Sequence, residues 1–184
     1  MNRRRDFIAT ARSQWRDVRP ELDTSSIEVI GRVLRCAAIL RQRLDAALAD
    51  EGLNRAEFDL LCALRRTDAA VTPGRLNELT VSSGAATTKR VHQLAGRGLL
   101  ERTTDERDRR SARVKLTEQG RELLDRAFTR NVEIEQHLLA GLGEDERETV
   151  ASGLSGLLRS LEGSADAAIT HPHPPEERSG PAGR

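Results

Sequence analysis

Apolar residues recur at helical intervals through the first third of the chain. Between residues 26 and 50 they fall three, four and seven positions apart, which predicts one long helix with a single apolar stripe. Gly52 ends this helix, and Asn54 is a suitable N-cap for a second helix that runs to about Arg66. The stripe of the long helix is Ile27, Ile30, Leu34, Ala37, Leu44 and Leu48, and the apolar positions of the second helix are Phe58, Leu61, Cys62 and Leu64.

Two shorter helices are predicted next. Thr72 and Pro73 mark the start of one that continues to about residue 79, because proline at the first helical position loses no hydrogen bond. Ser82 or Ser83 caps the other, which ends near Gly98, where glycine supplies the left-handed residue that closes many helices. The inner positions of this second short helix are Val91, Leu94 and Ala95.

The pattern then changes period. Residues 99–102 and 112–116 read as short strands joined by a charged turn at 105–110, which predicts a β-hairpin. Thr117 caps a long helix that runs through Leu142, and a last helix is expected over residues 144–161. The tail at 163–184 holds four of the six prolines and has no apolar periodicity, so we expect it to be disordered.

This order of elements predicts a mainly α fold with a small β-wing. Two short helices with a tight connection, the second opening with small and hydroxyl residues and followed by a two-stranded hairpin, form a winged helix-turn-helix lobe, which we place at residues 51–118.

Composition narrows the class of protein. The chain has 184 residues, 37% of them hydrophobic and 32% charged, and contains no apolar run long enough for a membrane helix, so a soluble protein is expected. The arginines at residues 3–5 are followed by no apolar segment, which argues against a secretory signal and favours the cytoplasm. Two cysteines are too few for a disulfide scaffold, and no spacing of Cys or His indicates a metal site; we expect no cofactor.

Positive charge is concentrated in one segment. The formal net charge is only +1, but residues 82–116 carry nine Lys or Arg against four Asp or Glu. A helix that enters the major groove needs short or hydrogen-bonding residues at its start and basic residues further on, and arginines at a hairpin tip suit phosphates or a narrow minor groove. The predicted DNA-binding residues are Ser82, Ser83, Thr87, Thr88, Lys89 and Arg90 on the helix and Arg107, Arg109 and Arg110 on the turn. The alternative is a solvated charged hairpin.

At these positions the chain resembles the MarR-type transcriptional regulators. The motifs are G-R-G-L-L-E-R at 96–102, D-E-R-D-R-R-S at 105–111 and V-K-L-T-E-Q-G at 114–120. The resemblance implies an obligate homodimer on a pseudo-palindromic DNA operator, with residues 1–50 and 119–162 forming the dimerisation region. Lys89 departs from the small polar residue usual there, so no base preference is carried over.

The chain is also similar to the branch of that family that responds to urate and related purines such as xanthine. That resemblance implies a ligand site formed by Trp15, Asp59, Arg90 and Arg102. A flat anion would stack on the indole and pair with the guanidiniums, and Asp59 would act as a switch because an arriving anion repels its carboxylate. The result would be a repressor released from DNA by its ligand.

Other interpretations of these residues stay open. Trp15 could be a packing anchor, Arg90 a phosphate contact, and Arg102 and Asp59 solvent-facing residues. Redox sensing through Cys36 is a competing idea, but we expect that thiol to lie among apolar residues and to be inert. Further alternatives are a phenolic or unknown effector and a winged-helix adaptor that binds only protein; no catalytic motif points to an enzyme.

Overall fold

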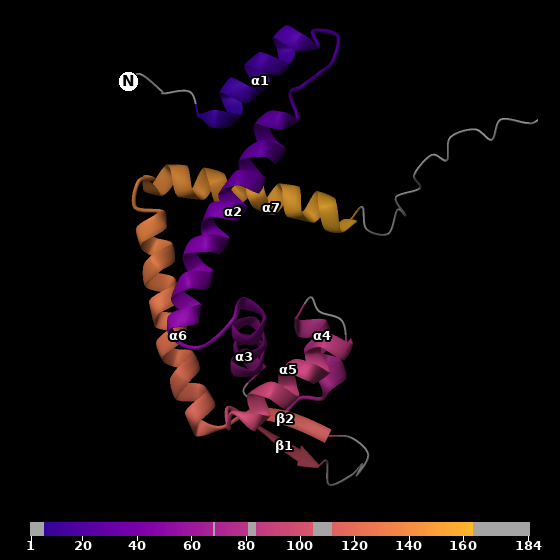
Figure 1. The fold of residues 1–184 in the computed structure, drawn as a ribbon, viewed down its shortest axis with the longest axis vertical. Helices are drawn as coiled ribbons and strands as arrows, with labels where there is room; N and C mark the ends of the chain where they lie inside the picture. Colours follow the sequence, from indigo (N-terminus) through magenta and orange to yellow (C-terminus); the bar gives the residue numbers. More distant parts are fainter. Residues whose placement is uncertain (1–5, 68, 81–83, 105–111, 164–184) are drawn as a thin grey trace, which may run out of the picture. The chain divides into compact units, whose positions relative to one another are not determined.

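The computed structural model describes residues 6–67, 69–80, 84–104 and 112–163. The described residues form seven helices and two strands, and they belong to two compact units that divide between His137 and Leu138. Figure 1 shows the order of the elements. They are α1 (Phe7–Val18), α2 (Ile27–Asp50), α3 (Arg55–Thr67), α4 (Pro73–Leu79), α5 (Gly84–Gly96), β1 (Leu100–Thr104), β2 (Ala112–Leu116), α6 (Glu118–Leu138) and α7 (Glu144–Gly163).

The junction between α2 and α3 forms as its local chemistry predicts. Gly52 has φ +69°, the left-handed conformation that favours glycine. Asn54 and Glu57 form a capping box: the Glu57 backbone N–H donates to Asn54 Oδ1 at 3.0 Å, and the Asn54 N–H donates to Glu57 Oε2 at 3.0 Å. The start of α3 is therefore held by two reciprocal hydrogen bonds.

Helices α3, α4 and α5 pack around one hydrophobic core. Leu61, Leu76 and Leu94, one from each helix, are fully buried. Thr72 caps α4 by accepting from the Arg75 N–H at 3.3 Å, and Gly98 follows α5 with φ +72°. These contacts confirm the predicted pair of short helices and the glycine that closes the second one.

The hairpin pairs antiparallel with Leu100 opposite Leu116 and Thr104 opposite Ala112. Val71, just before α4, pairs with Val114 through two backbone hydrogen bonds of 3.0 and 2.8 Å, which ties the hairpin to the helices. The predicted charged turn at 105–110 lies outside the described residues.

The start of α6 packs closely on the turn before β1. Thr117 caps the helix through Oγ1, which accepts from the Gly120 N–H at 3.0 Å. A Cβ on Gly120 would lie well inside 3.0 Å of the Leu99 carbonyl oxygen, a separation that real Cβ atoms do not show. The glycine of the V-K-L-T-E-Q-G motif is therefore required by a backbone approach.

Helix α6 ends at Leu138, not at Leu142 as predicted. A turn follows that contains Gly141 and Gly143, and glycine costs a helix about 1 kcal/mol per residue relative to alanine. The Gly143 N–H donates to Glu146 Oε2 at 3.0 Å, so this glycine begins the next helix instead of continuing the last one.

Large apolar side chains remain on the surface of α2. The predicted stripe is buried only in the last turns, where Leu48 is 1% exposed, whereas Leu34 is 66% exposed. Cys36 is exposed as well, which corrects the expectation that this thiol lies buried among apolar residues.

Helix α7, in the second unit, leaves Val150, Leu154, Leu158 and Leu161 exposed along its length. No helix in the described ranges is both long enough and apolar enough to span a membrane.

Candidate functional site

Helix α5 presents one face to the core and another to solvent. Thr87, Val91 and Leu94 are buried, and Thr88, Lys89 and His92 are exposed. The Thr88 hydroxyl donates to the Gly84 carbonyl at 2.9 Å, one turn earlier in the helix. The exposed face therefore carries short polar and basic side chains, the chemistry that suits the edges and phosphates of duplex DNA.

Thr87 corrects one sequence prediction. The sequence predicts an outward side chain here, but Thr87 is 1% exposed and lies four and seven residues before Val91 and Leu94, on the inner face of the helix. A side chain in that position cannot reach a base. Ser82, Ser83, Arg107, Arg109 and Arg110 lie outside the described residues.

The carboxyl end of α5 is fastened to the α2–α3 turn by Arg97. Its Nη2 donates to the Gly52 carbonyl at 2.8 Å, and its Nη1 lies 3.4 Å from Glu57 Oε1. The Glu57 side chain is 10% exposed and also caps α3. Sequence reasoning missed this connection because 40 residues separate the two partners.

A pocket of about 640 Å³ opens between α3, α5 and α6. Asp59 of α3 and Arg90 of α5 both line it, so the structure brings these two predicted ligand residues to one site. Further charged and polar residues of the lining are Arg55, Arg66, Thr80, Asn131 and Glu135, and apolar parts come from Ala56, Phe58, Leu79, Phe128 and Val132.

Arg55 of α3 lines this pocket and contacts residues of α2 and α6. Its Nε lies 3.4 Å from Asp45 Oδ1 of α2, its Nη2 lies 3.5 Å from Asn131 Oδ1 of α6, and its Nη1 lies 4.0 Å from Asp59 Oδ1. Its guanidinium also lies 5.3 Å from the centre of the Phe58 ring. Asn131 is buried and donates to Glu135 Oε1 at 2.6 Å. Charge placed in the pocket therefore acts on three helices.

The ionisation of Asp59 is sensitive to its surroundings. Burial raises the pKa of this carboxyl above its usual range, against the opposing effects of Arg55 and Arg66. Because the side chain is still 54% exposed, the carboxylate stays within reach of a ligand.

The other two predicted ligand residues lie elsewhere in the chain. Trp15 is on α1, 52% exposed, and does not line the pocket. Its helix packs on α2, where Ile8 contacts Gly31 and Arg32 Nε lies 2.9 Å from Asp6 Oδ2. Arg102 is an exposed residue of β1, with Nη1 3.4 Å from His92 Nε2. Within one chain the structure thus joins Asp59 and Arg90 but adds neither Trp15 nor Arg102 to them.

Sequence reasoning missed the remaining polar lining residues for two different reasons. Arg55 and Arg66 lie four residues before and seven after Asp59, a spacing that places all three on one helix face, so the pattern contained the signal. Asn131 and Glu135 come from a helix more than 60 residues away, and only the tertiary fold brings them in.

The described residues give little support to a reactive-cysteine site or to a metal site. Cys62 lines the pocket, and burial raises the pKa of its thiol to about 11, so little thiolate exists at neutral pH. No group of three or more His, Cys, Asp or Glu suited to a metal ion occurs in the described ranges.

The sequence of this chain is similar to those of known transcriptional regulators. A sequence profile of the MarR family matches residues 51–111. The chain is 34% identical over 136 residues to the HTH-type transcriptional regulator PecS of Dickeya dadantii (strain 3937), an alignment that covers 73% of this chain and 82% of PecS.

Solved structures of transcriptional regulators share this fold. A mutant of MarR from E. coli complexed with operator DNA is 25% identical with a TM-score of 0.63, over 74% of this chain and 99% of that one. BpsR of Bordetella bronchiseptica, whose DNA binding is regulated by 6-hydroxynicotinic acid, is 27% identical with a TM-score of 0.64, over 77% of this chain and 97% of that one.

Proposed function

This chain belongs to the MarR family of winged-helix transcriptional regulators, and from that premise we propose that it is a homodimeric repressor released from its operator by a small anionic ligand. The ligand class we favour is urate or a related purine such as xanthine. The single observation that carries the ligand part is the pocket that joins Asp59 to Arg90, a residue of the helix that would enter the DNA groove.

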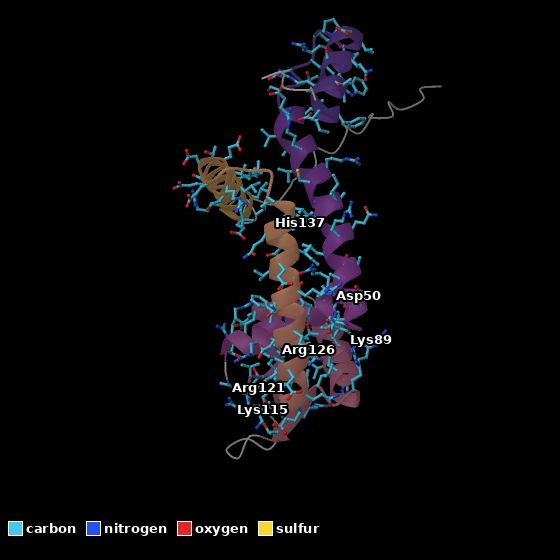
Figure 2. All side chains as sticks on the ribbon, turned by 90° about the vertical axis from the view of Figure 1, so that its left-hand side faces the viewer. Asp50, Lys89, Lys115, Arg121, Arg126 and His137 are labelled. Atoms are coloured by element: carbon cyan, nitrogen blue, oxygen red, sulfur yellow. The ribbon has the colours of Figure 1, made fainter. Side chains whose placement is uncertain are left out.

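DNA binding is proposed to use the outward face of α5 and the wing. Thr88 and Lys89 lie on that face, and Figure 2 places Lys89 on the opposite side of the lobe from Lys115 and Arg121. Arg90 is assigned both to the ligand pocket and to DNA contact. The other predicted DNA contacts remain Ser82, Ser83, Arg107, Arg109 and Arg110. The operator complex of the related E. coli protein supports this use of the fold.

The dimer is proposed to form through the apolar faces of the helices outside the lobe. Leu34 on α2 and Leu158 on α7 are both more than half exposed in the single chain. Burial of apolar surface is worth roughly 25 cal/mol per Å², so such rows of side chains favour association. The domains proposed from sequence follow: dimerisation regions at 1–50 and 119–162 on either side of the lobe at 51–118.

A DNA titration tests the first half of the proposal. A dimer should bind a pseudo-palindromic site with half-sites about 10 bp apart. The logarithm of the association constant should fall linearly with the logarithm of the salt concentration, with a slope of roughly −0.9 for each phosphate neutralised. Lys89→Ala should weaken binding and flatten this slope, whereas Arg65→Ala removes a surface cation of α3 that pairs with Asp125 Oδ1 at 3.3 Å, away from α5 and the wing, and should change neither. A monomeric protein, or a DNA affinity that does not change with salt concentration, would favour the alternative that this chain is an adaptor that binds only protein.

The charge of the pocket supports an anionic ligand. Arg55, Arg66 and Arg90 line it against the two carboxylates Asp59 and Glu135. Guanidiniums hold planar oxyanions by paired charge-assisted hydrogen bonds. A heteroaromatic acid such as the 6-hydroxynicotinic acid that regulates the relative BpsR has the same flat, anionic character and belongs in the same test panel.

Asp59 is proposed as the switch. An anion that pairs with Arg90 approaches the Asp59 carboxylate, and the resulting repulsion moves α3 relative to α5. Asp59→Asn removes the repulsion, so ligand should still bind while DNA release is blunted. Asp50→Asn is the matched control, because that carboxylate lies on α2 and pairs with Arg130 Nη2 at 3.1 Å, outside the pocket lining. Full release from the Asp59→Asn variant would refute the switch.

Trp15 and Arg102 enter the proposal through the family resemblance. Because Trp15 is the only tryptophan, its fluorescence reports directly on whether the indole stacks on a bound purine. Strong quenching by urate, corrected with free tryptophan for absorption by the purine, would place Trp15 at the ligand. Ligand-induced DNA release without quenching would restrict the site to the residues that line the pocket, and Arg102→Ala would then leave ligand affinity unchanged.

A further inference from the structure

Arg102 and His92 meet on the surface of the lobe, and neither lines the pocket that joins Asp59 to Arg90 (the Asp59–Arg90 pocket). Arg102 Nη1 of β1 lies 3.4 Å from His92 Nε2 of α5, and both side chains are exposed. Side chains two positions apart share one face of a strand, so Arg102 lies on the same face as Leu100, which is 3% exposed. The packing of β1 on α5 therefore brings this arginine to the helix.

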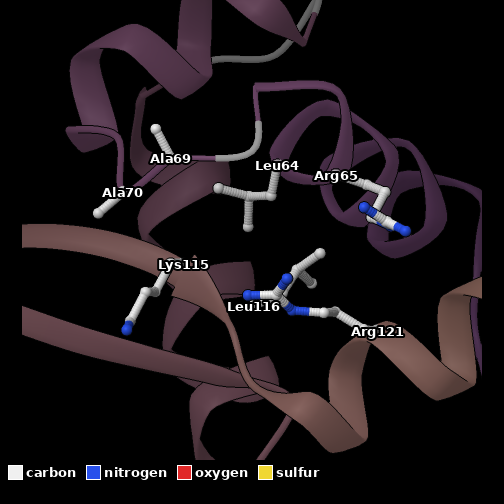
Figure 3. A pocket seen from close by; sticks show the side chains of 7 residues that line it. All are labelled: Leu64, Arg65, Ala69, Ala70, Lys115, Leu116 and Arg121. Atoms are coloured by element: carbon white, nitrogen blue, oxygen red, sulfur yellow. The ribbon is translucent and has the colours of Figure 1, made fainter.

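Lys115 of the same hairpin lies on a different side of the lobe. Glu101, the neighbour of Arg102 in β1, is on the opposite face of the strand, and its Oε1 lies 2.7 Å from Lys115 Nζ. Lys115 lines a separate pocket together with Arg65 and Arg121 (Figure 3). These two cations of one hairpin are thus directed to different sides, and Arg102 is the one that meets α5.

The contact between Arg102 and His92 depends on the protonation of the imidazole. A guanidinium offers five N–H donors and no acceptor, so a hydrogen bond between the two side chains needs a lone pair on His92 Nε2. A proton on that nitrogen would place two cations in contact. The geometry of the structure is therefore that of a neutral imidazole, and histidine is the side chain that gains its charge between about pH 5 and pH 8.

The elements around His92 offer no free carboxylate to accompany such a charge. Lys89 lies three residues earlier on α5, and α5 itself contains no Asp or Glu. On the two elements that pack against this helix, the carboxylates are Glu78 of α4 and Glu101 of β1. Glu78 pairs with Arg75 within α4, and Glu101 pairs across the hairpin. Within α4, α5 and β1, the counter-charge for a protonated His92 must therefore come from an anion that binds here.

The place of this pair in the lobe suits a phosphate of the DNA backbone. The first residues of a recognition helix reach base edges, and half or more of the hydrogen bonds between protein and DNA go to phosphate and sugar. His92 follows Thr88 and Lys89 by one turn on the same exposed face of α5, further from the start of the helix. A backbone phosphate has two free oxygens, so it can accept from Arg102 and from a protonated His92 together.

We propose that Arg102 and His92 form a clamp for one phosphate of the DNA backbone, and that His92 takes up a proton from solvent when the phosphate enters. The phosphate replaces the direct contact between the two side chains, and the proton goes to Nε2, the atom that accepts from Arg102 in the free protein. This inference rests on the proposed DNA-binding function and does not depend on the identity of the effector.

The test measures the affinity of the full chain for a rhodamine-labelled duplex that the parent chain has selected from a random-sequence pool. Titrations at about pH 6 and about pH 8, at one ionic strength, detect proton uptake, because uptake of one proton changes the association constant by up to about tenfold per pH unit. We expect the gain in affinity at the lower pH to be at least about threefold larger for the parent than for His92→Gln. All other titratable groups are common to the two proteins, so this comparison isolates His92.

Two further variants test the two halves of the clamp. His92→Lys keeps a cation at both pH values, so it should lack the pH dependence that His92 contributes and bind at the higher pH more tightly than His92→Gln. Arg102→Gln should weaken binding at both pH values and reduce the salt slope by about 0.9, the effect of one phosphate. Lys115→Gln is the matched control, because it removes an exposed cation from the other face of the same hairpin and should change neither quantity. Circular dichroism establishes that each variant is folded.

Each outcome decides the proposal. A pH-dependent gain that is lost in His92→Gln, together with a smaller salt slope in Arg102→Gln alone, supports it. Equal pH dependence in the parent and in His92→Gln overturns the proton uptake while the proposed function stands. If Arg102→Gln lowers purine affinity and leaves DNA affinity unchanged, Arg102 has the ligand role that the resemblance implies and the clamp is wrong. A parent chain that selects no duplex refutes the proposed function, and this inference with it.

Discussion

The connection between Glu57 and Arg97 allows a quantitative prediction. Glu57→Ala removes the acceptor for the Asn54 N–H, a capping bond of 3.0 Å worth about 1 kcal/mol, and an ion pair of 3.4 Å to a part-exposed arginine worth about 0.5 kcal/mol. Glu57→Gln keeps an amide oxygen for the cap and loses only the charge. We therefore expect losses of unfolding free energy of about 1.5 kcal/mol for the alanine variant and about 0.5 kcal/mol for the glutamine variant.

Urea unfolding at fixed protein concentration measures both losses, because a dimer's apparent stability depends on concentration. At a slope of ~1–3 kcal/mol per M, the alanine variant should unfold about 0.5–1.5 M earlier than the parent. If the two variants lose equal stability, the ion pair and not the cap dominates, and the reasoning is wrong. Arg97→Ala supplies the complementary measurement: it leaves the capping box intact but also removes the hydrogen bond to the Gly52 carbonyl, so it should lose more stability than Glu57→Gln.

Three further predictions concern single positions. Gly120→Ala should destabilise the protein by about 1–3 kcal/mol in urea, because its Cβ meets a backbone carbonyl, whereas Gly156→Ala, which meets nothing within 4 Å, should be neutral or stabilising. In a Cys36→Ser background, Cys62 should react with a disulfide reagent far more slowly in the native state than in urea, because its pKa of about 11 leaves ~0.1% thiolate at pH 8. Burial raises the pKa of Asp59, so the charged form of this carboxyl disfavours folding. Asp59→Asn should therefore increase the unfolding free energy by less than about 1 kcal/mol at pH 7, and this increase should vanish as the pH falls through the raised pKa. An increase that grows at low pH would contradict this sign.

Local chemistry made most of the lobe predictable from the sequence. Gly52 and Gly98 adopt positive φ, and Asn54 and Thr117 cap the helices that they precede, because each of these features depends on residues within one turn. Thr87 shows the limit of such reasoning. Its hydroxyl suggested a DNA contact, and only the helical phase relative to Val91 identifies it as a core residue.

Contacts between distant segments were not predictable in this way. Arg97 and Glu57 meet across the lobe, and Asn131 reaches Arg55 from 76 residues away. The ligand site implied by the resemblance depends on such contacts as well. Packing of the helices brings Asp59 and Arg90 to the lining of one pocket, whereas Trp15 lies on α1, which packs on α2.

Helix α3 connects the Asp59–Arg90 pocket to α5, the helix that we propose for the DNA groove, at two points. Asp59, on the pocket side, shares that cavity with Arg90 of α5, and Glu57, two residues earlier, meets Arg97 just beyond the end of α5. A ligand changes an equilibrium only through a difference in its affinity for two states, so an effector must favour one arrangement of α3 and α5 over another. If the Arg97 connection is stiff, an anion that draws Arg90 toward it rotates α5 about a fixed carboxyl end, and the amino-terminal turns of that helix move most. Those turns carry Thr88 and Lys89, which are the described residues that we assign to the DNA groove.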